Sequence, residues 1–401
     1  MGEPVSAPMS FQIAGLGRKL GGNDKTTDAK SEGGSVKPGS ARKPRQGRAG
    51  RKLRFVDQRD AYAAIDLGTN SCRMLIAVPD DAGFNVVDGF SRVVRLGERV
   101  SETGRFQQAA VGRTISALKH CAERMAARNV IRIRAVATQA CRQAADSSEF
   151  LSRVRDETGL GLEIIGAAEE AALTVAGCGD LLNSGYGHAL VFDIGGGTTQ
   201  MISVEPPPMS PARLLDMISL PFGVVSLRDE YGAEALPTDD FHALLKRIDD
   251  ALAPFDARNR IADAIAANDV RMVGTSGTVT TLGAMYLDLP RYKRNRVDGL
   301  EIRFDSIRQI GGKLAAMTCE ERIAHPCLGH GRGDLMLMGL ALLRAICARW
   351  PVGKLGVADR GIREGILAEL MLADGHDRFG LGLDRGDIPP DALIREGGNG
   401  R

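Results

Sequence analysis

Ala61-Tyr-Ala-Ala-Ile-Asp-Leu-Gly-Thr-Asn-Ser71 is the stretch that decides the fold, and Leu190-Val-Phe-Asp-Ile-Gly-Gly-Gly-Thr-Thr-Gln200 repeats its plan in the second half of the chain. In each copy an apolar, strand-like run delivers an aspartate, Asp66 or Asp193, and a glycine follows two residues later. A repeated strand, Asp-x-Gly turn and strand predicts two similar halves that face each other across a cleft. Ligands are expected between such halves.

Both loops have the composition of a phosphate-binding turn. Glycine lets the backbone turn sharply and bring its N–H groups against an anion, while short hydroxyl and amide side chains add donors. The predicted phosphate-binding residues of the two loops are Gly68, Thr69, Asn70, Ser71, Gly195, Gly196, Gly197 and Thr198. A carboxylate would repel the same anion, so Asp66 and Asp193 are predicted to hold a hard cation such as Mg²⁺ beside the phosphates.

The composition is that of a globular protein with material for two cores: of 401 residues, 43% are hydrophobic and 25% are charged. The net charge of +2 is uneven, because residues 1–55 hold 12 Lys or Arg against 4 acidic residues. The sequence contains no apolar run of membrane-spanning length and no apolar core of a secretory signal, which favours a cytoplasmic location. The seven cysteines are scattered and form no C-x-x-C pair, as is typical of reduced thiols.

Composition also divides the chain into segments. Residues 1–55 are predicted to form a disordered basic tail, which either contacts a polyanion or acidic lipid or serves only as a solubilising extension. Residues 56–182 and 183–374 are predicted to be the two folded halves, and residues 375–401 a flexible tail. Between the tails, strands are predicted at 61–66, 72–78, 84–93, 131–137, 162–165, 188–193, 199–205, 213–219, 270–273 and 354–358.

Helices are predicted at 107–128, 146–158 and 168–181, through much of 304–347, and after Asp359. A loop is expected to end at Arg142. The alternation of strands and helices predicts an α/β fold of two mixed-sheet, ribonuclease H-like halves.

Further motifs make the chain resemble the exopolyphosphatase/guanosine pentaphosphate phosphohydrolase (Ppx/GppA) family of the actin, Hsp70 and sugar-kinase superfamily. The resemblance covers roughly residues 60–372. Besides the two loops, it rests on Ala137-Thr-Gln-Ala-Cys-Arg142, Ala168-Glu-Glu-Ala171, Gly274-Thr-Ser-Gly-Thr278 and Ala358-Asp-Arg-Gly-Ile-Arg-Glu-Gly365. It implies two actin-like subdomains with the site between them, and hydrolysis of terminal phosphoanhydride bonds.

The resemblance also implies roles for single residues. Glu170 matches the family's proposed general base, and Arg142 would place a charged fork on phosphoryl oxygens. Without the resemblance, Glu170 reads equally as a helix-favouring carboxylate and Arg142 as a surface ion-pair partner. The turn before the helix near 278 would add an anion site of Gly274, Ser276, Gly277 and Thr278, or is a simple capped turn.

Two departures from the family pattern stand out. Gln200 occupies a position where the family commonly has an acid, and Ala171 and Ala172 follow the glutamate pair where an arginine is often seen. Both favour reduced activity or an altered substrate. Arg73 and Arg95 are also expected to face the cleft, where they rank below Arg142 as candidates to bind the polyanion. Arg332-Gly-Asp334 is interpreted as a helix cap beside a surface arginine.

The leading hypothesis is a cytoplasmic, Mg²⁺-dependent hydrolase that releases phosphate from the ends of inorganic polyphosphate. The alternatives are the same reaction on guanosine pentaphosphate, a polyphosphate- or nucleotide-binding regulator with weakened catalysis, and a sugar or acid kinase of the same superfamily. Members of the family form dimers, so a homodimer is possible. No membrane partner is expected.

Overall fold

The computed structural model describes residues 60–81, 83–182, 185–206, 212–328 and 331–376. The predicted basic tail, residues 1–55, lies outside these ranges, and so does the predicted C-terminal tail from residue 377 onward. All described residues belong to one compact unit, residues 59–401.

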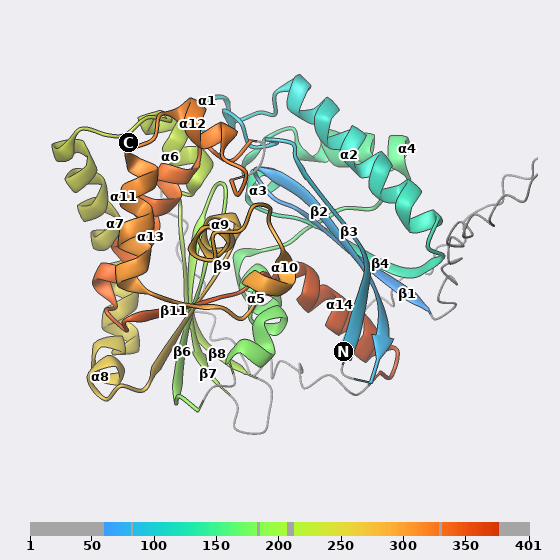
Figure 1. The fold of residues 1–401 in the computed structure, drawn as a ribbon. Coiled ribbons are helices and arrows are strands. Elements are labelled where there is room, and N and C mark those ends of the chain that lie inside the picture. The colour runs from blue at the N-terminus through green and yellow to red at the C-terminus, as the bar shows by residue number, and fades with distance from the viewer. Residues whose placement is uncertain (1–59, 82, 183–184, 207–211, 329–330, 377–401) are drawn as a thin grey trace, which may run out of the picture. The chain divides into compact units, whose positions relative to one another are not determined.

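Two mixed sheets form the framework (Figure 1). The strands of the first sheet lie in the order β3-β2-β1-β4-β5, and those of the second in the order β10-β11-β9-β6-β7-β8. The strand bounds are β1 Ala61–Leu67, β2 Ser71–Asp80, β3 Gly83–Val93, β4 Val130–Ala137, β5 Glu163–Ile164, β6 His188–Ile194, β7 Thr199–Glu205, β8 Arg213–Leu220, β9 Val270–Thr275, β10 Glu301–Arg303 and β11 Lys354–Val357.

The second sheet repeats the topology of the first. In each, a meander of three antiparallel strands, β1-β2-β3 or β6-β7-β8, continues through parallel pairing of its first strand to β4 or β9. Asp66 and Asp193 are the penultimate residues of the equivalent strands β1 and β6. In the antiparallel register, Asp66 lies opposite Arg73 and Asp193 lies opposite Gln200.

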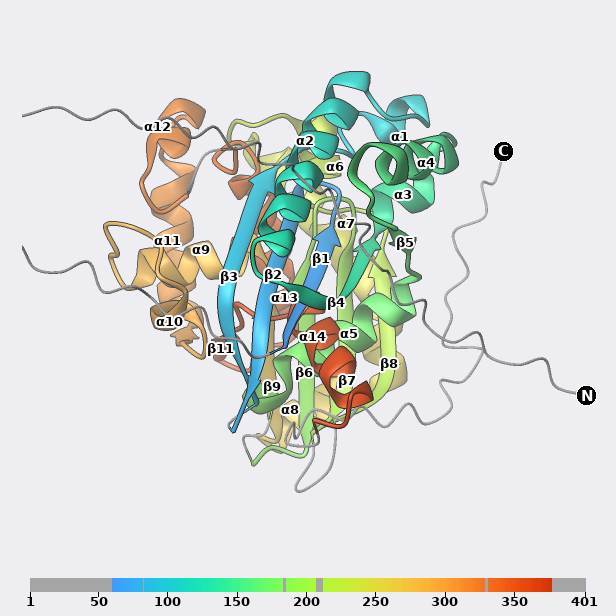
Figure 2. The ribbon, with the colours of Figure 1, turned by 90° about the vertical axis from the view of Figure 1, so that its right-hand side faces the viewer.

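The helices cover the faces of the sheets, and Figure 2 shows α2 across the outer face of the first sheet. Their bounds are α1 Val100–Thr103, α2 Gln108–Ala126, α3 Gln139–Gln143, α4 Ser147–Thr158, α5 Ala167–Leu182, α6 Val224–Tyr231, α7 Thr238–Asn259, α8 Ile261–Ala266, α9 Gly277–Tyr286, α10 Arg294–Val297, α11 Phe304–Ala315, α12 Cys319–Ala324, α13 Met336–Arg349 and α14 Ile362–Ala373. None of the described helices is both long and apolar enough to cross a membrane.

Strand β1 is buried on both faces, as its apolar sequence requires. Its alternate residues Ala63 and Ile65 belong to one core with α2, whereas Tyr62 and Ala64 belong to another with α14. Successive side chains of a strand point to opposite faces, so an unbroken apolar run serves a sheet that has helices on both sides.

Helices α5 and α14 lie side by side between the two sheets (Figure 1). Their backbones approach closely at two glycines: a Cβ atom on Gly177 would collide with the Gly361 carbonyl, and one on Gly365 with the Leu173 carbonyl. Helix α14 packs on the first sheet although it follows the strands of the second. The chain therefore returns to the first sheet at its C-terminal end, while the predicted boundary between domains 56–182 and 183–374 stays a prediction.

The predicted α/β class with two mixed sheets is confirmed. The segment before Arg142, predicted as a loop, is instead the short helix α3. Strand β10 was not predicted, because three residues at a sheet edge carry too little pattern to be recognised.

Candidate active site

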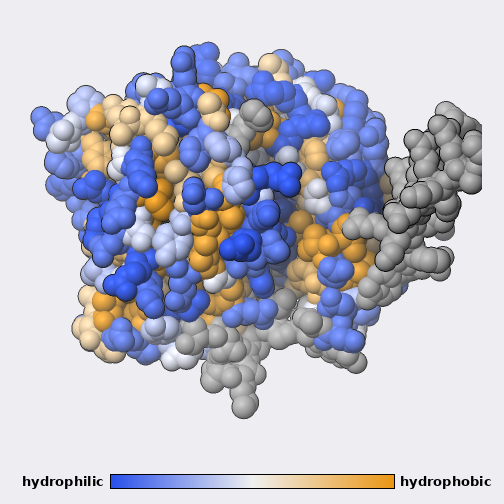
Figure 3. All heavy atoms as spheres, in the orientation of Figure 1, coloured by the Kyte–Doolittle hydropathy of each residue, from blue (hydrophilic) through white to orange (hydrophobic). Residues whose placement is uncertain are grey.

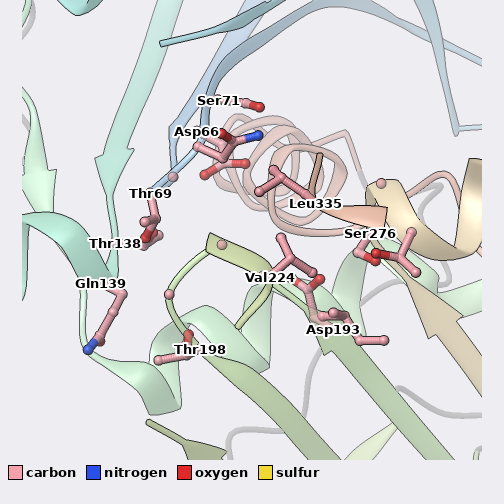
Figure 4. Close-up of a pocket in the computed structure, with 18 of the residues that line it drawn as sticks. Asp66, Thr69, Ser71, Thr138, Gln139, Asp193, Thr198, Val224, Ser276 and Leu335 are labelled. Carbon is pink, nitrogen blue, oxygen red and sulfur yellow. The ribbon is translucent and has the colours of Figure 1, made fainter. Parts of the chain in front are cut away.

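A cavity of about 120 Å³ lies where the loop after β1, the loop after β6 and the first turn of α9 meet (Figure 4). Most of the residues that the sequence singled out line it. They are Asp66, Gly68, Thr69, Asn70, Ser71, Glu170, Asp193, Gly195, Gly196, Gly197, Thr198, Ser276, Gly277 and Thr278. The duplicated motifs, far apart in the sequence, therefore share one site.

The two loops have the same internal turn. The Gly68 amide donates to the Ser71 carbonyl over 3.0 Å, and the Gly195 amide donates to the Thr198 carbonyl over 2.9 Å. The second loop is also held by α6, because the Val225 amide at the start of this helix donates to the Gly196 carbonyl over 2.7 Å. These bonds fix both loops before any ligand arrives, which preorganises the site.

Three carboxylates share the cavity. Burial raises the pKa of Asp66, and burial together with the charge of Asp66 raises the pKa of Asp193 to about 6, against the opposing effect of Arg73. Burial likewise raises the pKa of Glu170 to about 7, and the charges of Asp193 and Asp66 add to this shift. A cluster of acids in one buried site is unfavourable unless a cation binds beside it or one of the carboxyl groups stays protonated.

Glu170 is held by Arg142. Glu170 lies in the first turn of α5, and its Oε2 accepts a hydrogen bond of 3.1 Å from Arg142 Nη1, which also donates to the Ile165 carbonyl over 2.7 Å. The remaining face of the guanidinium donates to Gln139 Oε1 over 2.8 and 3.1 Å. Arg142 does not line the cavity, so in this structure it contacts the predicted base and not the space for phosphate.

Arg73 and Arg332 supply the cationic side chains of the cavity wall. The sequence pattern favoured Arg142 over Arg73, yet the position of Arg73 on β2, opposite Asp66, places it in the cavity wall. Burial and the charge of Arg73 lower the pKa of Arg332 to about 10. Two like charges so close together favour an anion between them.

The interpretation of Arg332-Gly-Asp334 as a helix cap was wrong. Helix α13 begins after Leu335 without a side-chain cap, and the buried Asp334 instead accepts a hydrogen bond of 2.8 Å from Arg95. Arg332 faces the cavity and packs near Gly277 at the start of α9. The sequence signal that could have identified Arg332 is the Arg-x-Asp stretch itself. We interpreted this stretch as a helix cap, because an Asp before an apolar helix usually caps it.

The predicted anion site before α9 separates into two parts. Gly274 does not line the cavity; it faces Phe192 on the neighbouring strand β6, where only a glycine fits. Ser276 has a left-handed φ of 108°, which strains a residue with a side chain, and its buried Oγ has no hydrogen-bond partner among the described residues. Strain and an unpaired hydroxyl at one residue are typical of a functional position.

Gln200 lies beside the cavity, opposite Asp193 in the sheet register. It is only 2% exposed, and within the described ranges neither its Oε1 nor its Nε2 has a hydrogen-bond partner. The neighbouring loop leaves Asn70 Oδ1 in the same condition. Buried amides normally find partners, so these atoms indicate a ligand or ordered water at the site.

Comparisons with known proteins agree with this geometry. The family model described as Ppx/GppA phosphatase family matches residues 75–374. Exopolyphosphatase 2 of Mycobacterium tuberculosis is 30% identical over 328 residues, which cover 77% of this chain and 98% of that protein. The guanosine-5'-triphosphate,3'-diphosphate pyrophosphatase of Aeromonas hydrophila is 29% identical over 335 residues, which cover 83% of this chain and 62% of that protein.

Solved structures show the same fold. The Aquifex aeolicus member of the Ppx/GppA family matches with a TM-score of 0.65 at 27% identity, over 79% of this chain and 99% of that one. An exopolyphosphatase from Cytophaga hutchinsonii matches with a TM-score of 0.70 at 22% identity, over 79% of this chain and 98% of that one. The latter likeness concerns the fold alone.

Proposed function

This chain belongs to the Ppx/GppA phosphatase family and is a phosphoanhydride hydrolase, and we propose that it releases terminal phosphate from inorganic polyphosphate in a Mg²⁺-dependent reaction. The observation that carries the proposal is the single cavity in which two glycine loops, three carboxylates and two arginines converge. The likeness to an exopolyphosphatase along nearly that protein's whole length supports the choice of substrate.

Asp66 and Asp193 would hold the magnesium ion. Their oxygens are the ligands this hard cation prefers, and their pKa values are raised mainly because burial disfavours the charged carboxylates, an effect that a bound cation would offset. Among the described residues, no group of three or more acidic, His or Cys side chains is placed to hold a metal ion together. This suits Mg²⁺, which usually takes one or two carboxylates and completes its shell with water and substrate phosphates. Bound there, the ion would neutralise phosphoryl oxygens.

The phosphates would be held by the loops and the two arginines. Backbone N–H groups at Gly196 and Gly197, with the first turn of α9 at Gly277, offer donors to phosphoryl oxygens. Arg73 and Arg332 would neutralise the negative charge that builds up in the transition state. Phosphoryl transfer requires mainly such positioning and neutralisation.

Glu170 would accept a proton from the attacking water. A pKa of about 7 is matched to general-base chemistry at neutral pH, because the group is partly ionised and still basic enough to take the proton. Arg142 would orient this carboxylate and keep its pKa from rising further. We therefore give Arg142 a positioning role in place of direct phosphate contact.

The testing experiment is phosphate release by the purified full chain from polyphosphate and, side by side, from guanosine pentaphosphate, each titrated with Mg²⁺. Glu170→Gln should abolish release while retaining substrate binding. Glu169→Gln is the matched control, since Glu169 lies in the same turn of α5 but pairs with Arg134 at the surface. Turnover by the Glu170→Gln protein would remove Glu170 as the base.

Two alternatives rest on specific observations. The Aeromonas relative supports guanosine pentaphosphate as the substrate of the same chemistry. The neutral Gln200 beside Asp193 supports a regulator with weakened catalysis, which would bind polyphosphate without releasing phosphate at high Mg²⁺. We further propose a cytoplasmic location, in keeping with the seven free thiols. A homodimer and polyanion binding by the basic tail also remain predictions.

A further inference from the structure

A basic segment, Arg291-Tyr-Lys-Arg-Asn-Arg296, connects α9 to β10 and has no role in the site described so far. Arg291, Lys293 and Arg296 are exposed, and in the described part of the chain none of them has an acidic partner. Most of the other arginines in the described ranges are paired with carboxylates. Three unneutralised cations within six residues are therefore a local positive patch on a chain whose residues after 55 are acidic in sum.

The segment is firmly anchored by its other side chains. The Tyr292 hydroxyl donates to the Asp359 carboxylate. Arg294 Nη2 donates to the Asp359 carbonyl over 2.7 Å and to Glu364 Oε1 over 2.6 Å, where the buried Glu364 also accepts the Gly361 amide over 2.9 Å. The anchoring residues Tyr292 and Arg294 lie between the exposed cations, so the backbone that carries these cations is held in place.

The anchor adjoins the cavity wall. Ile362, within the same turn as Gly361 and Glu364, lines the cavity. Tyr292 also lies near Thr280 on α9, next to the cavity residue Thr281. Tyr292 and Asp359 are close enough to Arg332 that their charges influence its pKa. Strongly hydrophilic residues gather over α10 in Figure 3, at the place where Figure 1 shows this segment.

We propose that Arg291, Lys293 and Arg296 form an outer binding track for an extended polyphosphate chain whose end occupies the cavity. The inference rests on the proposed function and adds the substrate class, long chains rather than short ones. A terminal phosphate near Arg332 leaves the rest of the polyanion to run outward, and these three unpaired cations belong to the segment whose Tyr292 and Asp359 anchor lies close to Arg332. Flexible cations at an exposed surface suit a ligand that repeats one charged unit.

The test compares two triple variants in the full chain, so that the basic tail contributes equally. R291Q/K293Q/R296Q removes the track. R155Q/R303Q/K313Q is the matched control, because these exposed cations also lack acidic partners within the described residues and do not line the cavity. Each protein is assayed for phosphate release from long-chain polyphosphate and from tripolyphosphate, over a range of salt concentrations. Binding of end-labelled long polyphosphate is measured separately by fluorescence anisotropy.

The track variant is expected to raise KM and Kd for long polyphosphate about tenfold at low salt, which corresponds to about 1.4 kcal/mol for the three charges together. Its salt dependence should become shallower. Tripolyphosphate kinetics, kcat and the melting temperature should match those of the control variant. Long-chain values equal to the control would overturn the track, and so would an equal loss on both substrates.

Failure of the proposed function gives a different result. If the native chain releases no phosphate but binds long polyphosphate through these three residues, the track stands and the hydrolytic assignment falls. If RNA of similar charge binds more tightly than polyphosphate with the same three-residue dependence, the patch serves nucleic acid and the inference is overturned.

Discussion

Gly196, in the loop after β6, packs directly against Thr69, in the loop after β1. A Cβ atom on Gly196 would lie 2.9 Å from the Thr69 Cβ and 3.2 Å from the Asn70 amide nitrogen. Real Cβ atoms do not come this close to their neighbours, so only glycine permits the contact. The duplicated motifs therefore meet where the Gly196 backbone packs against the Thr69 side chain and the Asn70 backbone.

Gly196→Ala should push the loops apart and lower kcat/KM for phosphate release by roughly 100-fold, because a displacement of about 1 Å in a catalytic arrangement costs that much. Steady-state kinetics and a melting curve would check it. Gly112→Ala on α2 is the control: a Cβ there meets nothing within 4 Å, and alanine should leave activity intact while stabilising the helix by up to about 1 kcal/mol. Full activity in Gly196→Ala would show that the contact is dispensable.

Arg142→Gln should move the ascending limb of the pH–rate profile to higher pH. The positive charge and hydrogen bond of Arg142 lower the pKa of Glu170, so their loss raises it above about 7. Below that pKa, each further unit costs about tenfold in ionised base. Arg142→Lys should restore part of the shift. A raised KM with an unmoved profile would instead indicate direct phosphate contact.

Metal-free protein should lose stability as the pH rises from about 4.5 to about 7. The pKa of Glu170 is about 7 in the folded state and near 4.5 when it is unperturbed, so in this window the folded state holds a proton that the unfolded state has released. The loss is on the order of 3 kcal/mol for this group, with Asp193 acting in the same direction. Urea unfolding across this range would measure it.

Glu170→Gln should flatten that part of the pH–stability curve, because a neutral amide does not titrate. Glu169→Gln should leave the curve unchanged. An equally steep fall in both variants would mean that other groups set the pH dependence.

Gln200→Glu should make the protein more dependent on Mg²⁺. A fourth buried acid opposite Asp193 lowers the melting temperature of the metal-free protein, and a bound cation then restores it. Thermal unfolding against Mg²⁺ concentration would give a steeper rise than in the native chain. Gln108→Glu adds the same charge at an exposed position of α2 and should give no such rise. Identical Mg²⁺ responses in both would argue against metal at this site.

The sequence predicted most of the strands well, because their apolar runs have fixed length and end at glycine, proline or aspartate. Strands β1, β2, β3, β6, β7 and β8 lie within a few residues of the predicted ranges. The loops could be paired in advance because the same Asp-x-Gly turn occurs twice. Short elements such as α3 and β10 could not be predicted, since five or three residues carry too little periodic pattern.

The site residues show where such reasoning ends. Asp66, Asp193 and Glu170 were found from motifs and resemblance, whereas Arg332 was explained by a local cap that does not exist. Arg142 was expected to touch phosphate, and the structure places it on Glu170. In both cases the sequence showed a charged residue near the site but not the direction of its side chain.

By itself, the sequence determined the α/β class, the duplicated loops and the membership of a phosphatase family, because these depend on residue type and spacing along the chain. Only the tertiary structure decided which arginines enter the cavity and how strongly burial raises the pKa values of its carboxylates. Those outcomes depend on burial and on the distances between charges carried by different elements, and both arise only when the two sheets and the helices between them pack together.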